Sequence, residues 1–407
     1  MTVEHQPPSV FLTRLQIGNY RSIGGCDVRL GPLTVLAGPN AAGKSNFLDA
    51  LRFVRDAVRT SPARALEPRG GLDEVLHRDG AGRQAQSFHI HMEVRAHDGR
   101  TPFDAAYTVE IGTDPQRDPS LPVVRKDELV INGTLVGEPF APDPSGDEPV
   151  FRDDFLLPTR LSRANHEARA LVRSLGRMRF YEFLTPALRD VDDTSSSTSG
   201  QLLGERGSHL ARVLTKMSKQ YPWAKEAVDG YLSTMIDNAV AVDGVEVSEA
   251  SLAYVVGRFL QADGHETRID RRSLSEGTLR LTAVLAALFQ PLALEGNIPL
   301  VGIEEPEISL HPPMLGALYD ALVAASRNTQ VIITTQSADL LDNAAADPDH
   351  LLIVRDGGTG TVIGPIDGSG RRLLADGVLT LPELLRSGEM RPATASGPGQ
   401  REEGEQR

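Results

Sequence analysis

The N-terminal part of the chain alternates between strand-like and helix-like hydrophobic patterns. Apolar residues alternate loosely at first and then form short runs bounded by glycine or polar residues, which is typical of β-strands. Strands are predicted over residues 12–17, 28–30, 33–37, 87–95, 105–111 and 128–131. The last of them turns at Asn132-Gly133 into 134–136, a hairpin signal. After Ser45, apolar positions recur at helical spacing as far as Val58, which predicts an amphipathic helix.

The middle of the chain reads as helical, and strand–helix alternation returns from residue 270. Helices are predicted over 159–180, 205–240 and 314–325, the last started by Pro312-Pro313. Buried strands are predicted over 298–303, 330–334 and 350–354. Polar, Pro-, Gly- or Ser-rich stretches predict a frayed start, two loops and a disordered tail, over 1–10, 137–158, 192–200 and 392–407.

Composition restricts the class of protein. Of 407 residues, 40% are hydrophobic and 24% charged, so a large core can form and wholesale disorder is excluded. The net charge of −13 argues against nonspecific coating of DNA or of an anionic membrane. The single cysteine excludes an internal disulfide framework and a Cys-based zinc cluster. No apolar run reaches the ~18–20 residues of a membrane span and no signal peptide is visible, so we expect a cytoplasmic protein without a membrane partner.

A glycine-rich loop lies between the run at 33–37 and the first predicted helix. It fits the pattern G-x-x-x-x-G-K-[ST] with Gly38, Pro39, Asn40, Ala41, Ala42, Gly43, Lys44 and Ser45. Glycines let backbone N–H groups turn inward around phosphate oxygens, and the helix N-terminus adds partial positive charge. Lys44 is expected to reach the β- and γ-phosphates and Ser45 to bind Mg²⁺. The strand–loop–helix context favours this phosphate site over an ordinary glycine-rich turn.

A second set of candidate residues follows the apolar strand at 298–303, which ends in Glu304-Glu305. Successive strand residues point to opposite sides, so two adjacent carboxylates can take two roles. Glu304 would hold hydrated Mg²⁺, and Glu305 would orient or deprotonate the attacking water. The alternative is an acidic exit from a strand onto a solvated surface, which the nearby phosphate loop makes the weaker hypothesis.

Two further segments are weak when taken alone. Ser275 and Gly277 open an apolar helix, where a hydroxyl and backbone donors can meet an anion. Ser273 and Glu276 also have capping-box spacing, so an ordinary helix start stays open. Gln336 follows a buried strand, at a place where a sensor of the γ-phosphate can sit.

In this order and spacing, the four segments resemble the ATP-binding-cassette (ABC) class of the SMC, RecF and OLD type. The resemblance is greatest to small bacterial AAA-family ATPases without coiled-coil arms, and it covers residues 11–80 and 270–355 better than the middle. It implies an α/β fold: an ABC-type P-loop NTPase head with an antiparallel β-subdomain and an inserted helical lobe. The parts it implies are 1–140 with Walker A and the β-subdomain, 141–265 as a mainly helical inserted lobe, 266–391 with signature, Walker B and switch, and 392–407 as a tail.

The resemblance also implies roles for individual residues. ATP would be bound by Arg21, Gly38, Pro39, Asn40, Ala41, Ala42, Gly43, Lys44, Ser45, Asn46, Ser275 and Gly277. Catalysis would rest on Glu305, Lys44 and Gln336, and Mg²⁺ would be held by Ser45 and Glu304. Many relatives carry Asp at the position of Glu304, and transporter cassettes carry His at the position of Gln336. Gln84 and Gln86 are candidates for the Q-loop, although ordinary surface strand residues are the better interpretation.

In such ATPases the signature of one subunit completes the ATP site of another. The resemblance therefore implies a head-to-tail homodimer, or a higher oligomer, that ATP closes and hydrolysis to ADP and phosphate opens. The stretch after Val354 is shorter than the nuclease domain that OLD relatives append, so any DNA cleavage is expected to need a partner.

Two uses of such a switch stay open. The first is DNA repair or anti-phage defence, alone or with an effector such as a nuclease or toxin. DNA contact is suggested by an arginine-rich stretch, although a solvated helix is an alternative; its arginines are Arg160, Arg163, Arg169, Arg173, Arg177 and Arg179. The second use is an ATP-gated scaffold that docks an effector protein without contacting DNA. A transporter cassette is disfavoured by the long, strand-containing segment between Walker A and the signature.

Overall fold

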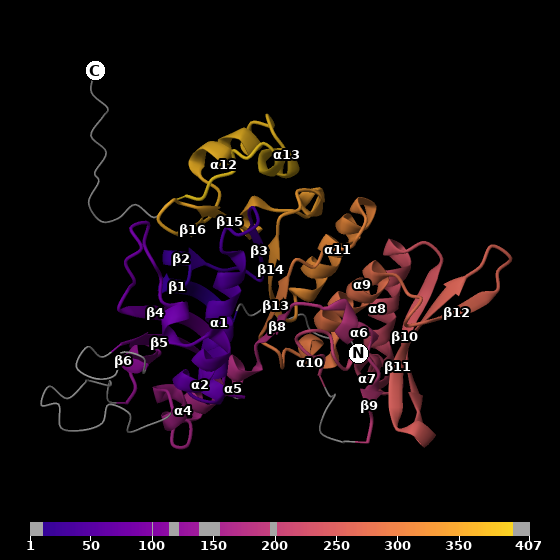
Figure 1. Ribbon diagram of the computed structural model, residues 1–407, viewed down its shortest axis with the longest axis horizontal. Helices are drawn as coiled ribbons and strands as arrows, with labels where there is room; N and C mark the ends of the chain where they lie inside the picture. The colour runs from indigo at the N-terminus through magenta and orange to yellow at the C-terminus, as the bar shows by residue number, and fades with distance from the viewer. Residues whose placement is uncertain (1–10, 100, 114–121, 138–154, 196–201, 394–407) are drawn as a thin grey trace, which may run out of the picture.

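The computed structural model describes residues 11–99, 101–113, 122–137, 155–195 and 202–393 (Figure 1). The described strands are β1 (Leu12–Tyr20), β2 (Ile23–Arg29), β3 (Leu33–Ala37), β4 (Ser87–His97), β5 (Pro102–Gly112), β6 (Val123–Ile131), β7 (Thr134–Leu135), β8 (Arg179–Tyr181), β9 (Asp192–Asp193), β10 (Ala239–Val247), β11 (Leu252–Leu260), β12 (Glu266–Asp270), β13 (Leu300–Glu304), β14 (Gln330–Thr335), β15 (Leu351–Asp356) and β16 (Thr361–Gly364). The described α-helices are α1 (Lys44–Arg59), α2 (Pro62–Leu66), α3 (Leu72–Val75), α4 (Leu157–Leu161), α5 (His166–Arg177), α6 (Thr185–Arg189), α7 (Leu210–Gln220), α8 (Pro222–Met235), α9 (Glu276–Phe289), α10 (Pro291–Leu294), α11 (Pro312–Ala325), α12 (Gly368–Ala375) and α13 (Leu381–Arg386). Short 3-10 helices are η1 (Glu67–Arg69), η2 (Ser248–Ala250), η3 (Asp339–Leu341) and η4 (Pro348–His350).

The N-terminal strands form an antiparallel sheet in the order β2-β1-β4-β5-β6-β7. Burial alternates along β4 and β5, because one face of this sheet packs against the core and the other meets solvent. Three aromatic rings join the sheet to α1. The ring centre of Phe88 lies 5.2 Å from that of Tyr20 and 5.3 Å from that of Phe53, and each pair packs edge to face. The hairpin predicted at Asn132-Gly133 is confirmed, with Ile131 paired to Thr134.

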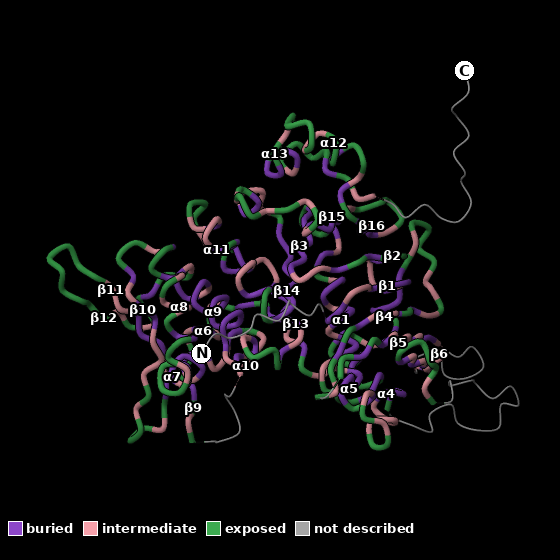
Figure 2. The backbone as a smooth tube through the Cα atoms, turned by 180° about the vertical axis from the view of Figure 1, so that it is seen from behind, coloured by how far each residue is buried: buried purple, intermediate pink, exposed green. Residues whose placement is uncertain are grey.

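The central sheet has the order β16-β15-β3-β14-β13-β8 and is parallel except for β16. Its inner strands are buried on both faces, as continuous apolar runs require. Leu36 packs on the side of α1 and α5, whereas Val35 packs on the side of α9 and α11, so the sheet separates two cores. Figure 2 shows this buried centre. The carboxyl ends of β3, β13 and β14 meet at one edge, where the sequence predicted the site.

In the segment 141–265, predicted as a mainly helical lobe, more of the described residues lie in helices than in strands. The sequence did not predict that the segment also contributes to a third sheet. α7 and α8 pack against a third sheet, in which β10, β11 and β12 are antiparallel and β9 pairs with β11. In addition, α5 packs on α1, and β8 pairs with β13 inside the central sheet. Predictions for residues 1–10, 138–154, 196–200 and 394–407 lie outside the described residues.

Helices α9 and α10 correct the expectation that no segment has the length and apolarity of a membrane span. Within the described residues, Glu276–Leu294 has 19 residues, and an 18-residue window of it has a mean hydropathy of 1.4, enough by length and composition alone. However, 72% of its apolar window is buried in this structure, with α9 packed against α8, α11 and β13. The segment is therefore explained as a core helix.

A buried lysine ties the third sheet to α8. Lys225 is 5% exposed and pairs with Asp229 at 2.6 Å and Asp243 at 2.9 Å. Replacing Lys225 by alanine leaves Asp229 without this cation, whereas Asp243 keeps Arg258 at 2.6 Å. We expect a loss of about 3 kcal/mol in the free energy of unfolding. Urea unfolding measures this loss. Lys219→Ala, which breaks an exposed pair with Glu246, is the matched control and should cost less than about 1 kcal/mol. Equal losses in the two variants would contradict the prediction.

Candidate nucleotide and metal site

The phosphate loop connects β3 to α1, and two of its positions require glycine. Gly43 has a φ of 102°, and a Cβ there would lie 2.2 Å from Thr361 Oγ1. A Cβ on Gly38 would lie 2.2 Å from the carbonyl oxygen of Val354. The backbone therefore follows a path that a side chain at either position would block, and its N–H groups could approach an anion bound in the loop.

The tip of the phosphate loop is exposed to solvent, and hydrogen bonds to other segments of the chain hold the end of the loop and the residue after it. Pro39, Asn40 and Ala41 are exposed. The carbonyl of Ala42, which is buried, accepts a 2.9 Å hydrogen bond from Thr361 at the start of β16. Asn46, the residue after the motif, donates to the hydroxyl of Ser22 in the turn after β1 (2.6 Å), and that hydroxyl lies 2.7 Å from the Thr361 hydroxyl.

Lys44 begins α1, and its ammonium group is folded into the loop. Its Nζ donates to the carbonyls of Gly38 (2.8 Å) and Pro39 (2.9 Å) and lies 4.0 Å from a carboxylate oxygen of Glu305. Burial lowers the pKa of Lys44, while the carboxylates of Glu305, Glu307 and Glu304 act in the opposite direction. A lysine in this position faces the loop in which phosphate oxygens would lie.

Ser45 and Glu304 meet, as the sequence predicted for the two metal ligands. The Ser45 hydroxyl donates to Glu304 Oε2 at 2.5 Å, and the other oxygen of Glu304 lies 3.5 Å from Nη2 of Arg52 on α1. Burial raises the pKa of Glu304, opposed by the Ser45 hydrogen bond and by the charge of Arg52. The Arg52 guanidinium lies 5.7 Å from the ring centre of Phe180 in β8. A hydroxyl and a carboxylate at this separation are the oxygen donors that Mg²⁺ prefers.

Glu305 and Gln336 are also brought together. The backbone of Glu305 adopts a φ of 43°, and its N–H donates to the carbonyl and the hydroxyl of Thr334, each at 3.1 Å. Nε2 of Gln336 donates to Glu305 Oε2 at 3.4 Å. This left-handed backbone conformation ends the extended path of β13 at Glu305. The Glu305 carboxylate points toward Lys44 and Gln336.

Sequence reasoning gave no role to Glu307, which the structure places in the same cluster. Its carboxylate is buried and accepts a hydrogen bond from the Thr335 hydroxyl. Burial raises the pKa of Glu307, and its Oε2 has no hydrogen-bond partner among the described residues. The signal for this residue was the third acid of the run Glu304-Glu305-Pro306-Glu307.

Ser275 is the N-cap of α9, accepting a 3.0 Å hydrogen bond from the N–H of Thr278, so Ser273 does not take the capping role. The first turn of α9 lies against the segment after β13, because a Cβ on Gly277 would lie 2.4 Å from the carbonyl oxygen of Ser309. Within the described part of the chain, no hydrogen bond links Ser275 to the phosphate loop. The structure therefore does not bring Ser275 to the phosphate loop of its own chain, and its role at the nucleotide stays a prediction.

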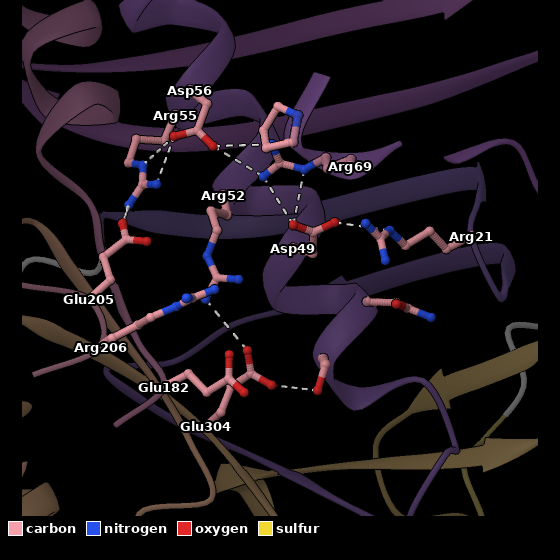
Figure 3. A pocket seen from close by; sticks show the side chains of 13 residues that line it. Arg21, Asp49, Arg52, Arg55, Asp56, Arg69, Glu182, Glu205, Arg206 and Glu304 are labelled. Atoms are coloured by element: carbon pink, nitrogen blue, oxygen red, sulfur yellow. Dashed lines mark hydrogen bonds and ion pairs between the residues drawn. The ribbon is translucent and has the colours of Figure 1, made fainter. Parts of the chain in front are cut away.

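Arg21 lies beside the loop in a charged cavity of about 480 Å³ that also contains Ser45, Asn46 and Glu304 (Figure 3). Its Nε lies 3.0 Å from Asp49 of α1, an ion pair that holds the guanidinium at the cavity wall. The sequence predicted this residue to approach the nucleotide, and its place beside Ser45 is compatible with that.

Glu182 lines the same cavity and was missed. It follows β8, which pairs with β13 so that Tyr181 lies opposite Ile303, and its charge raises the pKa of Glu304 slightly further. By contrast, Gln84 donates to the carbonyl of Asp73, and neither it nor Gln86 lines this cavity. Of these three residues, only Glu182 lines the cavity that contains Glu304.

The six arginines predicted as a DNA-contacting group do not form one surface. Arg160 lies 3.9 Å from Asp127, and burial lowers the pKa of Arg179. Four others are exposed on or beside α5: Arg163, Arg169, Arg173 and Arg177. Arg169 donates to two backbone carbonyls at the end of α4.

The residues fit ATP with Mg²⁺. The two glycine positions leave room where a Cβ would collide, and the pair Ser45 and Glu304 supplies oxygen donors. Among the described residues, no group of three or more His, Cys, Asp or Glu could hold a metal by itself. The metal would therefore depend on phosphate oxygens and water for its remaining ligands, as Mg²⁺ commonly does.

A phosphate loop after β3, paired acids after β13 and a glutamine after β14, at one edge of a parallel sheet with an antiparallel sheet beside it, define an ABC-type P-loop ATPase head. The family model described as "AAA domain, putative AbiEii toxin, Type IV TA system" matches residues 33–97 and 138–342. The chain belongs to this family, and the resemblance to SMC, RecF and OLD-type ATPases is confirmed. ATPases of this kind use ATP, typically with Mg²⁺.

Individual relatives point to the same class. The OLD nuclease of Thermus scotoductus is 23% identical over 364 residues, covering 81% of this chain and 60% of that protein. The chain thus spans about three fifths of the length of the OLD nucleases it matches. The replication and repair protein RecF of Brucella abortus is 33% identical over 81 residues, 20% of this chain and 19% of that protein. A crystal structure of an Smc head bound to the C-winged helix domain of ScpA has the same fold, with a TM-score of 0.55 at 11% identity over 89% of this chain and 99% of that one.

Proposed function

We propose that this protein binds and hydrolyses ATP with Mg²⁺ and uses the reaction to open and close a head-to-tail dimer. The observation that carries the proposal is the convergence of Lys44, Ser45, Glu304, Glu305 and Gln336 at one edge of the central sheet. These side chains come from three separated segments, and together they supply a cation, two metal-binding oxygens, a base and an amide.

Each residue has a role that its surroundings support. Lys44 would exchange its loop carbonyls for phosphate oxygens. Ser45 and Glu304 would hold Mg²⁺, which when bound withdraws charge from the β- and γ-phosphates. Glu305 would accept the proton of the attacking water, and the amide of Gln336 would orient that water through its contact with Glu305.

A second copy of the chain would complete the site. The N-cap hydroxyl of Ser275 and the start of α9 present donors without a hydrogen bond to the chain's own phosphate loop in the described residues. A partner's α9 N-terminus placed over the γ-phosphate would add these donors, so ATP would become part of the contact between subunits. Loss of the γ-phosphate on hydrolysis would weaken that contact.

Mixing two inactive variants tests this arrangement. Lys44→Ala and Ser275→Arg chains each lack one half of the site, but a mixed dimer regains one complete site. An equal mixture should therefore recover about a quarter of the wild-type ATPase rate, because half of the dimers are mixed and each has one working site.

The matched control mixes Lys44→Ala with Glu305→Gln. Lys44 and Glu305 belong to the same half of the composite site. In a mixed dimer, each of the two sites therefore contains one of the two changes, and no ATPase activity should return. The variants must be folded and the wild type must hydrolyse ATP. If ATPase activity then returns in neither mixture, the result would contradict a shared site and favour hydrolysis within one chain.

For the biological role, we propose DNA repair or anti-phage defence in the cytoplasm, together with an effector such as a nuclease or toxin. Support comes from the names of the relatives, which include OLD nucleases and a DNA replication and repair protein. The alternative is an ATP-gated scaffold that docks an effector protein without touching DNA, which the net charge of −13 favours. Purification of Glu305→Gln chains with ATP separates the two, since nucleic acid or a protein should remain bound.

A further inference from the structure

A second groove lies at the opposite edge of the central sheet from the nucleotide site. It has a volume of about 680 Å³ and separates α5 from the end of β4 and the loops that precede β13 and β14. Its polar groups include Arg173, Ser174 and Arg177 on one wall and Asn297 and Asn328 on the other. Because these loops enter the strands whose carboxyl ends carry Glu304 and Gln336, the groove is separate from the phosphate loop.

The wall formed by α5 carries uncompensated positive charge. α5 itself contains three arginines and one glutamate, a local charge of +2 in a chain of −13. Arg173 and Arg177 are exposed and have no ion-pair partner among the described residues. They are four residues apart on one helix, so their side chains are neighbours along the groove. Arg169, one turn earlier on the same face, extends the row and is fixed by its bonds to the Ser162 and Arg163 carbonyls.

Among the described residues, the opposite wall offsets only part of this charge, because it carries a single carboxylate. Arg95, at the end of β4, is already paired with Asp104 at 3.0 Å. Asp98 is the one carboxylate among the described residues that line the groove, and its Oδ1 accepts from the N–H of Thr101 within its own turn. Asn297 and Asn328 add amide groups, and Phe11 and Pro299 add apolar surface at the base.

We infer that this groove binds the phosphodiester backbone of a nucleic acid strand. Guanidinium groups bind phosphate oxygens in a bidentate manner, and Asn and Ser side chains are common donors to the same oxygens. A row of arginines at one-turn spacing can meet successive phosphates. Contacts to the phosphodiester backbone carry no sequence information, so the binding is expected to be independent of sequence. This inference rests on the nucleic-acid form of the proposed function.

Charge reversal in the groove tests the inference. Arg173→Glu with Arg177→Glu is compared with Arg268→Glu plus Arg372→Glu, which change the net charge equally at exposed arginines of β12 and α12. Binding of fluorescent single-stranded DNA, duplex DNA and RNA of one sequence is measured by anisotropy between 50 and 200 mM salt. The groove variant should lose at least tenfold in affinity. Its plot of log affinity against log salt should be shallower than that of the wild type by about 1.8 for duplex DNA and about 1.4 for single strands, because two phosphate contacts are lost. The control pair should stay within about threefold of the wild type at every salt concentration.

Several outcomes would overturn it. One is an absence of binding by the wild-type chain at 50 mM salt; another is an equal loss in the groove and control variants. A third outcome uses polyglutamate as a probe for an acidic protein. If the wild-type chain binds polyglutamate but no nucleic acid, and the groove variant alone loses this binding, the groove serves an acidic protein partner instead. A neutral variant, Arg173→Gln with Arg177→Gln, repeats the test should the charge reversal impair folding.

ATP binding measured in parallel keeps this inference separate from the proposed function. The groove variant should bind a nonhydrolysable ATP analogue as the wild type does, because the phosphate loop lies at the other edge of the sheet. A wild-type chain that binds nucleic acid through the groove but never hydrolyses ATP would contradict the proposed function and leave the groove assignment intact.

Discussion

Replacing Glu305 by glutamine should slow ATP hydrolysis at least ~100-fold, the usual contribution of a general base, while ATP binding is retained. The amide preserves the size of the side chain and its contact with Gln336, but it cannot take a proton from water. Because ATP then persists, the variant should also accumulate as a dimer when ATP is present. Single-turnover hydrolysis and size-exclusion chromatography with light scattering measure the two effects.

The matched control for this prediction is Glu249→Gln, a change of the same kind at an exposed residue of η2. It should behave as the wild type in both measurements. If Glu305→Gln turns over ATP within threefold of the wild type, Glu305 is not the base. The buried carboxylate of Glu307 would then be the next residue to test.

Replacing Lys44 by alanine should weaken binding of a nonhydrolysable ATP analogue about 10- to 100-fold, as expected for loss of charge-assisted hydrogen bonds worth about 1.5–3 kcal/mol. The ammonium is held inside the loop by two backbone carbonyls and is largely desolvated, so it can transfer to phosphate oxygens at little reorganisation cost. Isothermal titration calorimetry in Mg²⁺ measures the affinity.

Lys126→Ala, which removes a partly exposed lysine paired with Glu128 on β6, is the control for this change and should leave the affinity unaltered. Unaltered affinity in Lys44→Ala itself would show that the loop does not contact the triphosphate. A loss in both variants would instead indicate a general electrostatic effect of removing one positive charge.

The part of the site that the sequence predicted is the part encoded by local pattern. The phosphate loop combines a fixed spacing with a strand before it and a helix after it, so Lys44 and Ser45 could be assigned without any knowledge of distant contacts. Glu304 and Glu305 followed from an apolar strand that ends in acids. The family resemblance then supplied the fold and the pairing of these segments, and the fold agrees with it.

The part that was missed depends on long-range pairing. β8 has three residues directly after a helix, so its pattern cannot be separated from that of the helix. Glu182 reaches Glu304 because β8 pairs with β13, a contact between segments far apart in the chain. The third sheet was missed since β10 and β11 are half-buried strands whose alternation is interrupted by glycines and charges.

The six arginines do not share one surface because they belong to three different elements and the turns between them. Their sequence spacing predicts one helix, whereas the chain breaks between α4 and α5 and enters β8 after Arg177. Arg160 and Arg179 are thereby directed toward Asp127 and the protein interior. Residues at helical spacing share a surface only where the helix is continuous.

The position of β3 governs when this protein can fold during synthesis. In the described sheet, β3 pairs with β14 and β15, which are made about 300 residues later, whereas β1, β2, β4, β5 and β6 pair with strands much nearer in the chain. At roughly 5–20 residues per second, β3 and α1 would leave the ribosome about 15–60 s before β14 arrives. During that interval the apolar face of α1 has an incomplete core, and the closure of so long a loop is slow. A nascent chain halted before β14 should therefore be captured by chaperones, and one extended beyond β15 should be released.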